Sequence, residues 1–483
     1  MGLFSFLPLA QAAQPCGPGK IIKPPEVLKL EAFDFSDYHI ATLIIFVLAI
    51  FHTLSANRIT TYAQKLDRNY KAELKRLGKD PKEDVSFLAE ITTFLGEVEV
   101  IFALWIIPLF LLTAGFYDWN TALEYLDSRD FTEPLFVVVI MSLAGTKPIV
   151  EISERFISFL SKLVGGTISS WWLIILTIGP LLGSLVTEAG AMTITATLLS
   201  RKFYEYKPSL KLAYATLGLL FVNISVGGVL TNFAAPPVLV IARCWEWSSF
   251  FMLTQFGWKV IIGMLFANLS YWFMFRSELK SLEKERKAKN KIALPKQNSH
   301  IPFWITMTHI FFIFWIVLNS HYAAVFIGSF LIYLGFHKAT KPHQYANGIK
   351  RPLLVGLFLA GLIIHGGLQG WWIVPLMEKL GHTAVMVVGV ILTAFNDNAA
   401  ISYLTSLIPN WGADFKYAII SGVITGGGLT VIANAPNPAG FVILNKHFSG
   451  GISAVRLFLA AAFPTVLFFI MFYLPFLFGY RGT

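Results

Sequence analysis

Long apolar runs dominate this chain and restrict it to one kind of structure. Clear examples are Tyr38–Phe51, Ile101–Phe116, Ile261–Phe275 and Val466–Phe478. Only 14% of the 483 residues are charged, whereas soluble domains carry about 25%. Because the core of a bilayer offers no water to backbone N–H and C=O groups, apolar segments cross it as helices. We therefore predict an all-α polytopic membrane protein.

About ten segments are predicted to span the bilayer, since a helical span needs about 20 apolar residues. They are 38–56, 89–114, 134–150, 209–247, 250–275, 301–318, 321–336, 352–370, 415–447 and 451–479. The apolar stretches 165–203 and 383–410 are left over and need a different explanation.

Charged loops predict the orientation of these segments. Residues 57–84, 276–296 and 337–351 are rich in Lys and Arg, so we expect them in the cytoplasm. The loop 117–133 is acidic and is expected outside. The net charge of +10 reflects these loops, and we expect no nucleic-acid partner.

This orientation requires the two leftover stretches to be re-entrant hairpins. Stretch 165–203 must enter and leave on the cytoplasmic side, and stretch 383–410 on the outer side. Such backbone is tolerated at membrane depth where protein or a water-filled cavity surrounds it. Both termini are then extracytoplasmic.

The predicted organisation is a 5+5 inverted-topology repeat with two re-entrant hairpins. Each half has three spans, one hairpin, one broken span and one final span. The predicted boundaries are an N-terminal extracytoplasmic segment 1–37, a first repeat 38–275, a cytoplasmic basic linker 276–300 and a second repeat 301–483.

The two longest predicted spans contain nearly the same motif. Residues 227–234 read GGVLTNFA and residues 426–433 read GGGLTVIA, and prolines follow both. We expect helix breaks at Gly227, Gly228, Pro236, Gly426, Gly427 and Pro436. Gly- and Pro-broken helices in corresponding positions of two halves point to the binding site of a secondary transporter. Close helix packing at small residues is the alternative explanation.

Each predicted hairpin carries one acidic residue at its turn, Glu188 in the first and Asp397 in the second. A carboxylate at membrane depth costs at least about 2.5 kcal/mol and indicates function, although both could instead hold the turns through backbone N–H groups. The predicted ligands of a small cation are the oxygens of Thr187, Glu188, Thr231, Asn232, Asn396, Asp397, Asn398, Thr430, Asn434 and Asn437. A carboxylate that either a proton or a cation can neutralise would provide exchange directly.

Four other polar residues are possible accessory groups. Glu97 and Glu99 lie on different faces of one helix, so we expect at most one of them to face the pathway. Lys147 could counter a carboxylate or extend its amine to the cytoplasmic edge. His365 could relay protons or simply pack in the core.

The hairpin with a polar tip, followed by a break at Gly-Gly and Pro and present twice, resembles the ion transporter superfamily. That group includes sodium/proton antiporters, sodium-coupled di- and tricarboxylate transporters and arsenite permeases. The chain looks closest to a bacterial family described as sodium/proton antiporters. The resemblance implies a homodimer with a scaffold region and a mobile transport region. In the carboxylate transporters the hairpin tips carry Ser-Asn-Thr, whereas Glu188 and Asp397 stand here and would repel a dicarboxylate.

We therefore expect a sodium/proton antiporter of the bacterial inner membrane. The alternative is a sodium-coupled symporter of a small organic anion such as a di- or tricarboxylate. The chain lacks a His-Glu-x-x-His motif or another catalytic constellation, so we do not expect an enzyme. We expect no cofactor beyond sodium ions and protons, and the expected partners are the bilayer, small cations and a second copy of the chain.

Overall fold

A computed structural model describes residues 35–77, 80, 84–242, 244–289, 301–320, 322–344, 349–377, 379–408 and 411–478. The regular elements in these residues are α, 3-10 and π helices, and these residues contain no strand. The predicted all-α class is therefore confirmed. Of the predicted N-terminal segment 1–37 only the last three residues are described, and the predicted linker 276–300 is described up to residue 289.

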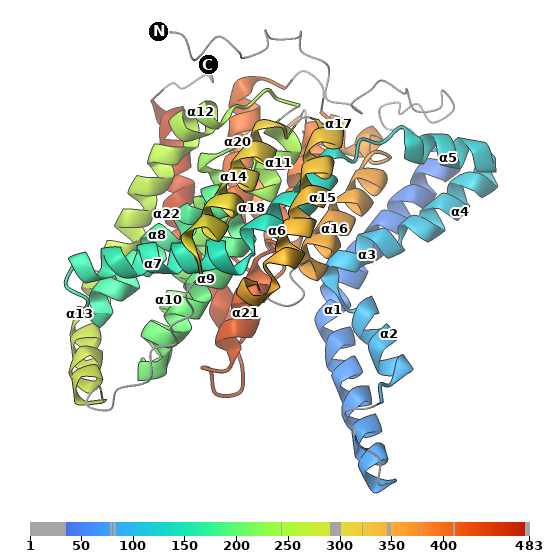
Figure 1. Cartoon of the computed structure of the whole chain (residues 1–483). Helices are drawn as coiled ribbons and strands as arrows, with labels where there is room; N and C mark the ends of the chain where they lie inside the picture. Colours follow the sequence, from blue (N-terminus) through green and yellow to red (C-terminus); the bar gives the residue numbers. More distant parts are fainter. Residues whose placement is uncertain are drawn as a thin grey trace.

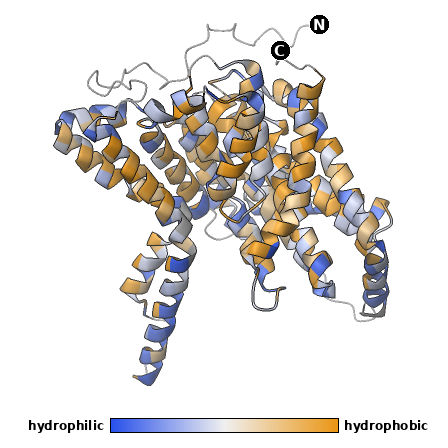
Figure 2. Cartoon of the chain, turned by 180° about the vertical axis from the view of Figure 1, so that it is seen from behind, coloured by the Kyte–Doolittle hydropathy of each residue, from blue (hydrophilic) through white to orange (hydrophobic). Residues whose placement is uncertain are grey.

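Within the described residues, five helices are long and apolar enough to cross a membrane, or up to eight if each bent pair counts as one span. Three shorter apolar helices are Phe303–Leu318, Ala323–Ala339 and His382–Phe395. Much of the ribbon of the body has the colour of hydrophobic residues in Figure 2. Many large apolar side chains of the described residues are exposed. The chain is a multi-pass membrane protein, and the count of ten spans stays a prediction.

The N-terminal helices form a projection beside the main body (Figure 1). Their bounds are α1 (Asp37–Arg76), α2 (Phe87–Leu95), α3 (Val98–Leu104), α4 (Ile106–Phe116) and α5 (Trp119–Asp127). The free end of α1 and the far end of α13 point to the same side and are hydrophilic (Figures 1 and 2). This places the described basic residues at the end of α1, up to Arg76, and at the end of α13, up to Lys289, on one side of the molecule.

The next two helices, α6 (Thr132–Ala144) and α7 (Lys147–Leu163), meet at a bend of 63°. The predicted span 134–150 therefore ends early. Gly145 follows α6, Thr146 precedes α7, and Pro148 lies in the first turn of α7, where a missing N–H costs nothing. Helix α7 runs across the body (Figure 1) and exposes Phe156 and Phe159, as suits a helix at the membrane interface.

The remaining helices of the first half surround a buried helix, α10. The bounds are α8 (Ile168–Val186), α9 (Glu188–Lys202), η2 (Tyr204–Tyr206), α10 (Leu210–Gly227), η3 (Gly228–Leu230), α11 (Pro236–Ala242), α12 (Ser249–Met252), the π-helix η4 (Leu253–Gly257) and α13 (Trp258–Lys289). Helices α8 and α9 pack against each other as a hairpin that turns at Thr187. All residues of the apolar window in 210–230 are buried.

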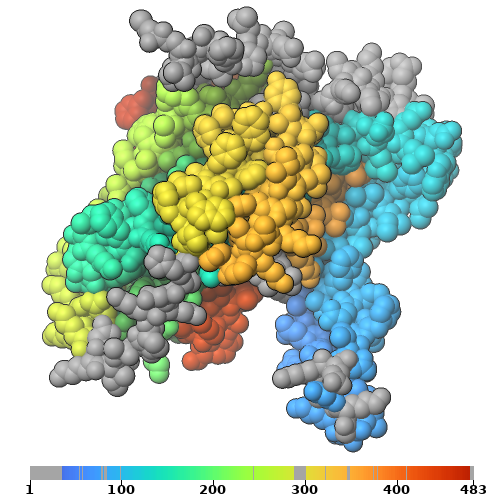
Figure 3. Space-filling view, in the orientation of Figure 1, coloured from blue at the N-terminus to red at the C-terminus, as the bar shows by residue number. Residues whose placement is uncertain are grey.

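The second half packs on the first through several of its helices. The bounds are α14 (Phe303–Leu318), α15 (Ala323–Ala339), η5 (Lys341–His343), α16 (Lys350–Gly366), α17 (Gly370–Met377), α18 (His382–Phe395), α19 (Asn398–Ser406), α20 (Ala413–Gly426), α21 (Asn437–Asn445) and α22 (Ala454–Leu477). Helices α14 to α16 cover one face of the molecule (Figure 3). The C-terminal ends of α10 and α20 meet in the core, where the Ser225 hydroxyl donates to Ile424 O at 2.7 Å.

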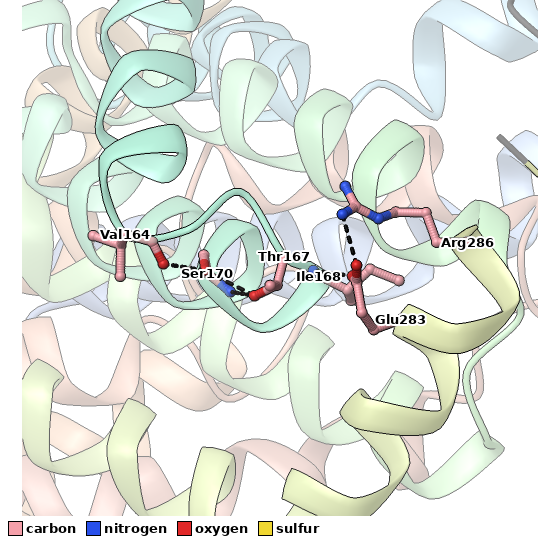
Figure 4. Close-up of polar contacts among 6 residues, drawn as sticks. All are labelled: Val164, Thr167, Ile168, Ser170, Glu283 and Arg286. Atoms are coloured by element: carbon pink, nitrogen blue, oxygen red, sulfur yellow. Dashed lines mark hydrogen bonds and ion pairs between the residues drawn. The ribbon is translucent and has the colours of Figure 1, made fainter.

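Two glutamates at the hydrophilic end of α13 accept hydrogen bonds from the N-termini of two other helices. Glu283 accepts a hydrogen bond from Ile168 N at 2.8 Å, at the start of α8, and forms an ion pair with Arg286 at 2.7 Å (Figure 4). Glu278 accepts from Ser209 N at 2.7 Å, just before α10. Because carboxylates satisfy free N–H groups and favour the positive end of the helix dipole, these contacts join α8, α10 and α13.

A proline inside α8 explains a buried group of amide side chains. Pro180 has no N–H, so the carbonyl of Leu176, four residues earlier, loses its helical donor. Asn223 of α10 donates to that carbonyl at 3.0 Å and Asn268 of α13 donates at 3.2 Å. The two amides also bond each other at 2.9 Å. The irregularity in α8 is thus satisfied by two neighbouring helices.

We expect Asn223→Ala to lower the free energy of unfolding by about 1 kcal/mol, measured by thermal unfolding in detergent. In a Pro180→Ala background the same substitution should cost less, because the backbone N–H that this exchange introduces can then donate to Leu176 O. Equal losses in both backgrounds would show that the amides do not serve that carbonyl.

Candidate functional site

Both broken helices stop at glycine and restart at proline. Helix α10 ends at Gly227 and α11 begins at Pro236, whereas α20 ends at Gly426 and Pro436 is the N-cap of α21. Proline suits a helix start because its φ is already helical and its N–H is not needed there. In the first break the 3-10 helix η3 continues α10 to Leu230, and the rest of both breaks is irregular backbone.

The second glycine of each break allows a hairpin tip to approach the backbone closely. A Cβ on Gly228 would lie 2.7 Å from Glu188 Oε1, and a Cβ on Gly427 would lie 3.0 Å from Asn398 Nδ2. The first distance is shorter than real Cβ contacts allow. Gly228 is therefore needed for the Glu188 carboxyl to lie where it does. At Gly427 the nearest atom is Ser225 Oγ of α10, so this glycine mainly allows α10 to approach the second break.

Side chains satisfy carbonyl groups that the breaks leave without helical donors. The Ser184 hydroxyl donates to Gly227 O at 2.7 Å. In the second break, Asn437 Nδ2 donates to both Gly427 O and Thr430 O at 2.8 Å. Because unsatisfied carbonyls are costly in an apolar surrounding, these bonds stabilise the irregular backbone, and sequence reasoning did not identify Ser184.

The threonine of each repeated motif holds its own hairpin. Thr231 donates to Ser184 O at 2.7 Å near the end of α8, and Thr430 donates to Ala394 O at 2.9 Å near the end of α18. The two contacts are equivalent in the two halves. Each hydroxyl proton is used in this way, so only the oxygen lone pairs remain for a ligand.

The hairpin turns are stabilised by their own polar side chains. Thr187 has a positive φ of 68° and its hydroxyl accepts from Gly190 N at 3.4 Å. Asp397 caps α19 by accepting from Ala399 N at 2.8 Å, and Asn396 Oδ1 accepts from Asp397 N at 2.9 Å. N-capping of this kind contributes about 1 kcal/mol, which is the structural role that sequence analysis left open for Asp397.

Both hairpin tips converge on the second break. Asn434 Nδ2 donates to Glu188 Oε2 at 2.8 Å, which links the two halves of the chain. Asn398 N donates to Ala433 O at 3.0 Å. The carboxyl groups of Asp397 and Glu188 interact by charge repulsion when both are ionised. Glu188 is 1% exposed, Asp397 6% and Asn434 0%, so each hairpin tip places a buried carboxyl group beside the second break. These residues and their amide neighbours are here called the buried polar cluster.

Several oxygens in this cluster have no hydrogen-bond partner among the described residues. They are Glu188 Oε1, Asn398 Oδ1, Asn434 Oδ1 and Asn437 Oδ1. Buried polar atoms are normally paired, so an unpaired set indicates an ion or a water that completes it. Carboxylate and amide oxygens beside a broken helix suit a sodium ion.

A large cavity leads from one side of the molecule to the first hairpin tip. This vestibule has a volume of about 890 Å³ and is lined by Thr187, Ala189 and Gly190 of the hairpin and by Pro436 of the second break. Its charged lining residues are Glu99, Lys147, Glu151, Glu154, Arg201, Lys350 and Arg351. The vestibule thus connects basic residues of the predicted cytoplasmic side with the buried cluster.

The four residues that the sequence suggested as accessory groups lie in different surroundings. Glu99 and Lys147 line the vestibule, and Glu99 is also an electrostatic neighbour of Asp397. Glu97 forms an ion pair with Lys350 at 3.3 Å. His365 is buried with its Nε2 at 3.1 Å from Phe102 O.

Asn232 belongs to a different contact from the one sequence analysis proposed for it. Its Nδ2 donates to Trp247 O at 3.0 Å, and its Oδ1 accepts from the Ser249 hydroxyl at 2.8 Å. Asn232 lines a second cavity together with Trp247. The residue that meets Glu188 is Asn434, whose counterpart 199 positions earlier is Ala235.

A family model described as "Putative Na+/H+ antiporter" matches residues 37–475. No curated protein matches the chain. Among solved structures, the chain is similar to the YdaH transporter of Alcanivorax borkumensis, whose crystal structure is described as revealing an unusual topology. The identity is 12%, the TM-score is 0.42, and the match covers 80% of this chain and 98% of that chain. Because the family model extends from the first residue of α1 nearly to the end of α22, this chain belongs to that antiporter family.

Proposed function

We propose that this transporter exchanges sodium ions for protons at the buried cluster of Glu188, Asp397 and Asn434. The observation that carries the proposal is the set of unpaired oxygens around the Glu188–Asn434 hydrogen bond. A sodium ion bound there would use Glu188 Oε1 and amide oxygens, and it would offset the repulsion between the two carboxyl groups.

Exchange follows from the cost of a buried charge. A carboxylate without a counter-ion is strongly disfavoured in an apolar surrounding. Glu188 and Asp397 are therefore stable when they bind a proton or neighbour a sodium ion, and binding one displaces the other. A neutralised cluster can change its exposure from one side of the membrane to the other, whereas an empty charged cluster cannot do so readily.

The proposal also includes the arrangement of the chain in the membrane and its oligomeric state. Each half would contribute a re-entrant hairpin and a broken span in an inverted 5+5 repeat, in the bacterial inner membrane and as a homodimer, with both termini extracytoplasmic. The equivalent contacts of Thr231 and Thr430, each with the end of the first helix of its own hairpin, support the repeat.

A second candidate function is sodium-coupled symport of a small organic anion, and the vestibule favours it. The beginnings of four helices, α7, α9, α16 and α21, contribute lining residues, and helix N-termini attract anions. Lys147, Arg201 and Arg351 also line it. Proteoliposomes distinguish the two functions: exchange gives sodium-driven proton movement without a carboxylate, and symport gives sodium-driven uptake of a labelled carboxylate without proton counterflow.

We expect Glu188→Gln and Asp397→Asn each to reduce sodium-driven proton movement in proteoliposomes to the level of empty liposomes. The amides keep the shape of the side chains but cannot bind and release a proton. Glu124→Gln, an exposed carboxylate of α5, serves as the control and should retain wild-type exchange. Full exchange activity in both site variants, with unchanged thermal stability, would contradict the assignment.

We expect Gly228→Ala to weaken the apparent sodium affinity about tenfold, or about 1.4 kcal/mol. The added Cβ would displace the Glu188 carboxyl that it contacts. Gly328→Ala is the matched control, because nothing lies within 4 Å of a Cβ at that position. The measurement is the sodium concentration that gives half-maximal proton movement, and equal values for the two variants would remove the steric argument.

A further inference from the structure

Three cavities follow one another past the first hairpin tip. The vestibule of about 890 Å³ lies on the predicted cytoplasmic side. A cavity of about 30 Å³ lies directly against Glu188. A third cavity of about 320 Å³, here called the outer cavity, is lined by Thr132, Glu133, Asn232, Glu246 and Trp247. In the proposed topology these last residues face the extracytoplasmic side.

The middle cavity is joined differently to its two neighbours. It shares Thr187, Ala189 and Pro436 with the vestibule, along with the neighbouring residues Met141, Val355 and Ala435. With the outer cavity it shares only Phe233 and Leu239 among the described lining residues. Glu188 is thus close to the vestibule, whereas two apolar side chains lie between it and the outer cavity.

Phe233 is held in this place by the residues before it and by the helix opposite. Thr231 is bonded to Ser184 O, and Asn232 is bonded to Trp247 O and Ser249. Phe233 and Leu239 both pack on the apolar cluster around Phe136 of α6. The Asn232 bonds therefore fix the backbone beside Phe233, whose side chain packs with Leu239 of α11 on this cluster.

We propose that Phe233 and Leu239 form the apolar barrier that separates Glu188 from the outer cavity, and that Asn232 is the positioning residue of this barrier. The inference rests on the proposed exchange function. An exchanger must keep its site closed to one side while it is open to the other, because simultaneous access would dissipate both gradients. An apolar constriction excludes water and ions since it offers them no polar partners.

The test is a proton leak measured in sodium-free proteoliposomes, driven by a potassium diffusion potential with valinomycin and followed with a pH-sensitive dye. We expect Phe233→Ala to raise the leak at least about fivefold above wild type and to lower the number of sodium ions moved per proton when sodium is present. Phe233→Leu keeps an apolar side chain and should remain tight. Asn232→Ala should give an intermediate leak, because it releases the backbone beside Phe233.

Phe312→Ala is the matched control, since Phe312 packs on the same apolar cluster and is not among the lining residues of the three cavities. Loss of packing alone would lower the thermal stability of both alanine variants without a leak. A proton-tight Phe233→Ala, or an equal leak in Phe312→Ala, would overturn the proposal. The leak is measured without sodium, so failure of sodium/proton exchange in the wild-type protein is a separate result.

Discussion

The need to satisfy backbone polar groups inside an apolar body governs this structure. Four interruptions place free carbonyl or amide groups in the core: the breaks after Gly227 and Gly426 and the hairpin turns at Thr187 and Asp397. Serine, threonine and asparagine side chains satisfy most of them at short range. Among the buried oxygens of the described residues that have no partner are Glu188 Oε1 and Asn434 Oδ1, whose side chains bond each other across the two halves of the chain. The candidate site is thus a region of irregular backbone where some buried side-chain oxygens have no hydrogen-bond donor.

Two nearly identical motifs have acquired different tasks. The break after Gly426 carries Asn434 and Asn437, whereas the corresponding positions after Gly227 are Ala235 and Val238. Asn434 reaches the first hairpin tip, whereas Asn437 satisfies carbonyls of its own break. The second hairpin tip bonds the backbone of this break through Ala433 O. The first break supplies close packing against Glu188 and, through Phe233, an apolar wall. The two similar motifs therefore differ in what they place beside Glu188: the second contributes the Asn434 amide and the first contributes the close approach of Gly228.

The charge distribution changes sharply between the buried cluster and the vestibule. The cluster holds two carboxyl groups, whereas the vestibule combines basic side chains such as Arg201 and Arg351 with several helix N-termini. A cation that reaches the cluster from the vestibule must pass this basic region, where Glu99 and Glu154 offer local compensation. The basic lining of the vestibule suits an anionic substrate. For a cation, the acidic residues of the vestibule would lower the electrostatic repulsion that it meets on entry.

The sequence by itself determined the class of the protein, because long apolar runs with few charges leave a helical membrane protein as the only solution. The positions of Gly and Pro also predicted where helices stop, because both residues act on the backbone conformation of their own segment. The tertiary structure decided which polar groups meet. Asn232 and Asn434 look equally suitable in the sequence, yet Asn232 turns to Trp247 and Asn434 reaches Glu188, 246 residues away. Ser184 and the amides around Leu176 escaped sequence reasoning for the same reason. Their importance depends on carbonyls left free in neighbouring helices, and only the packing of those helices shows which carbonyl each side chain can reach.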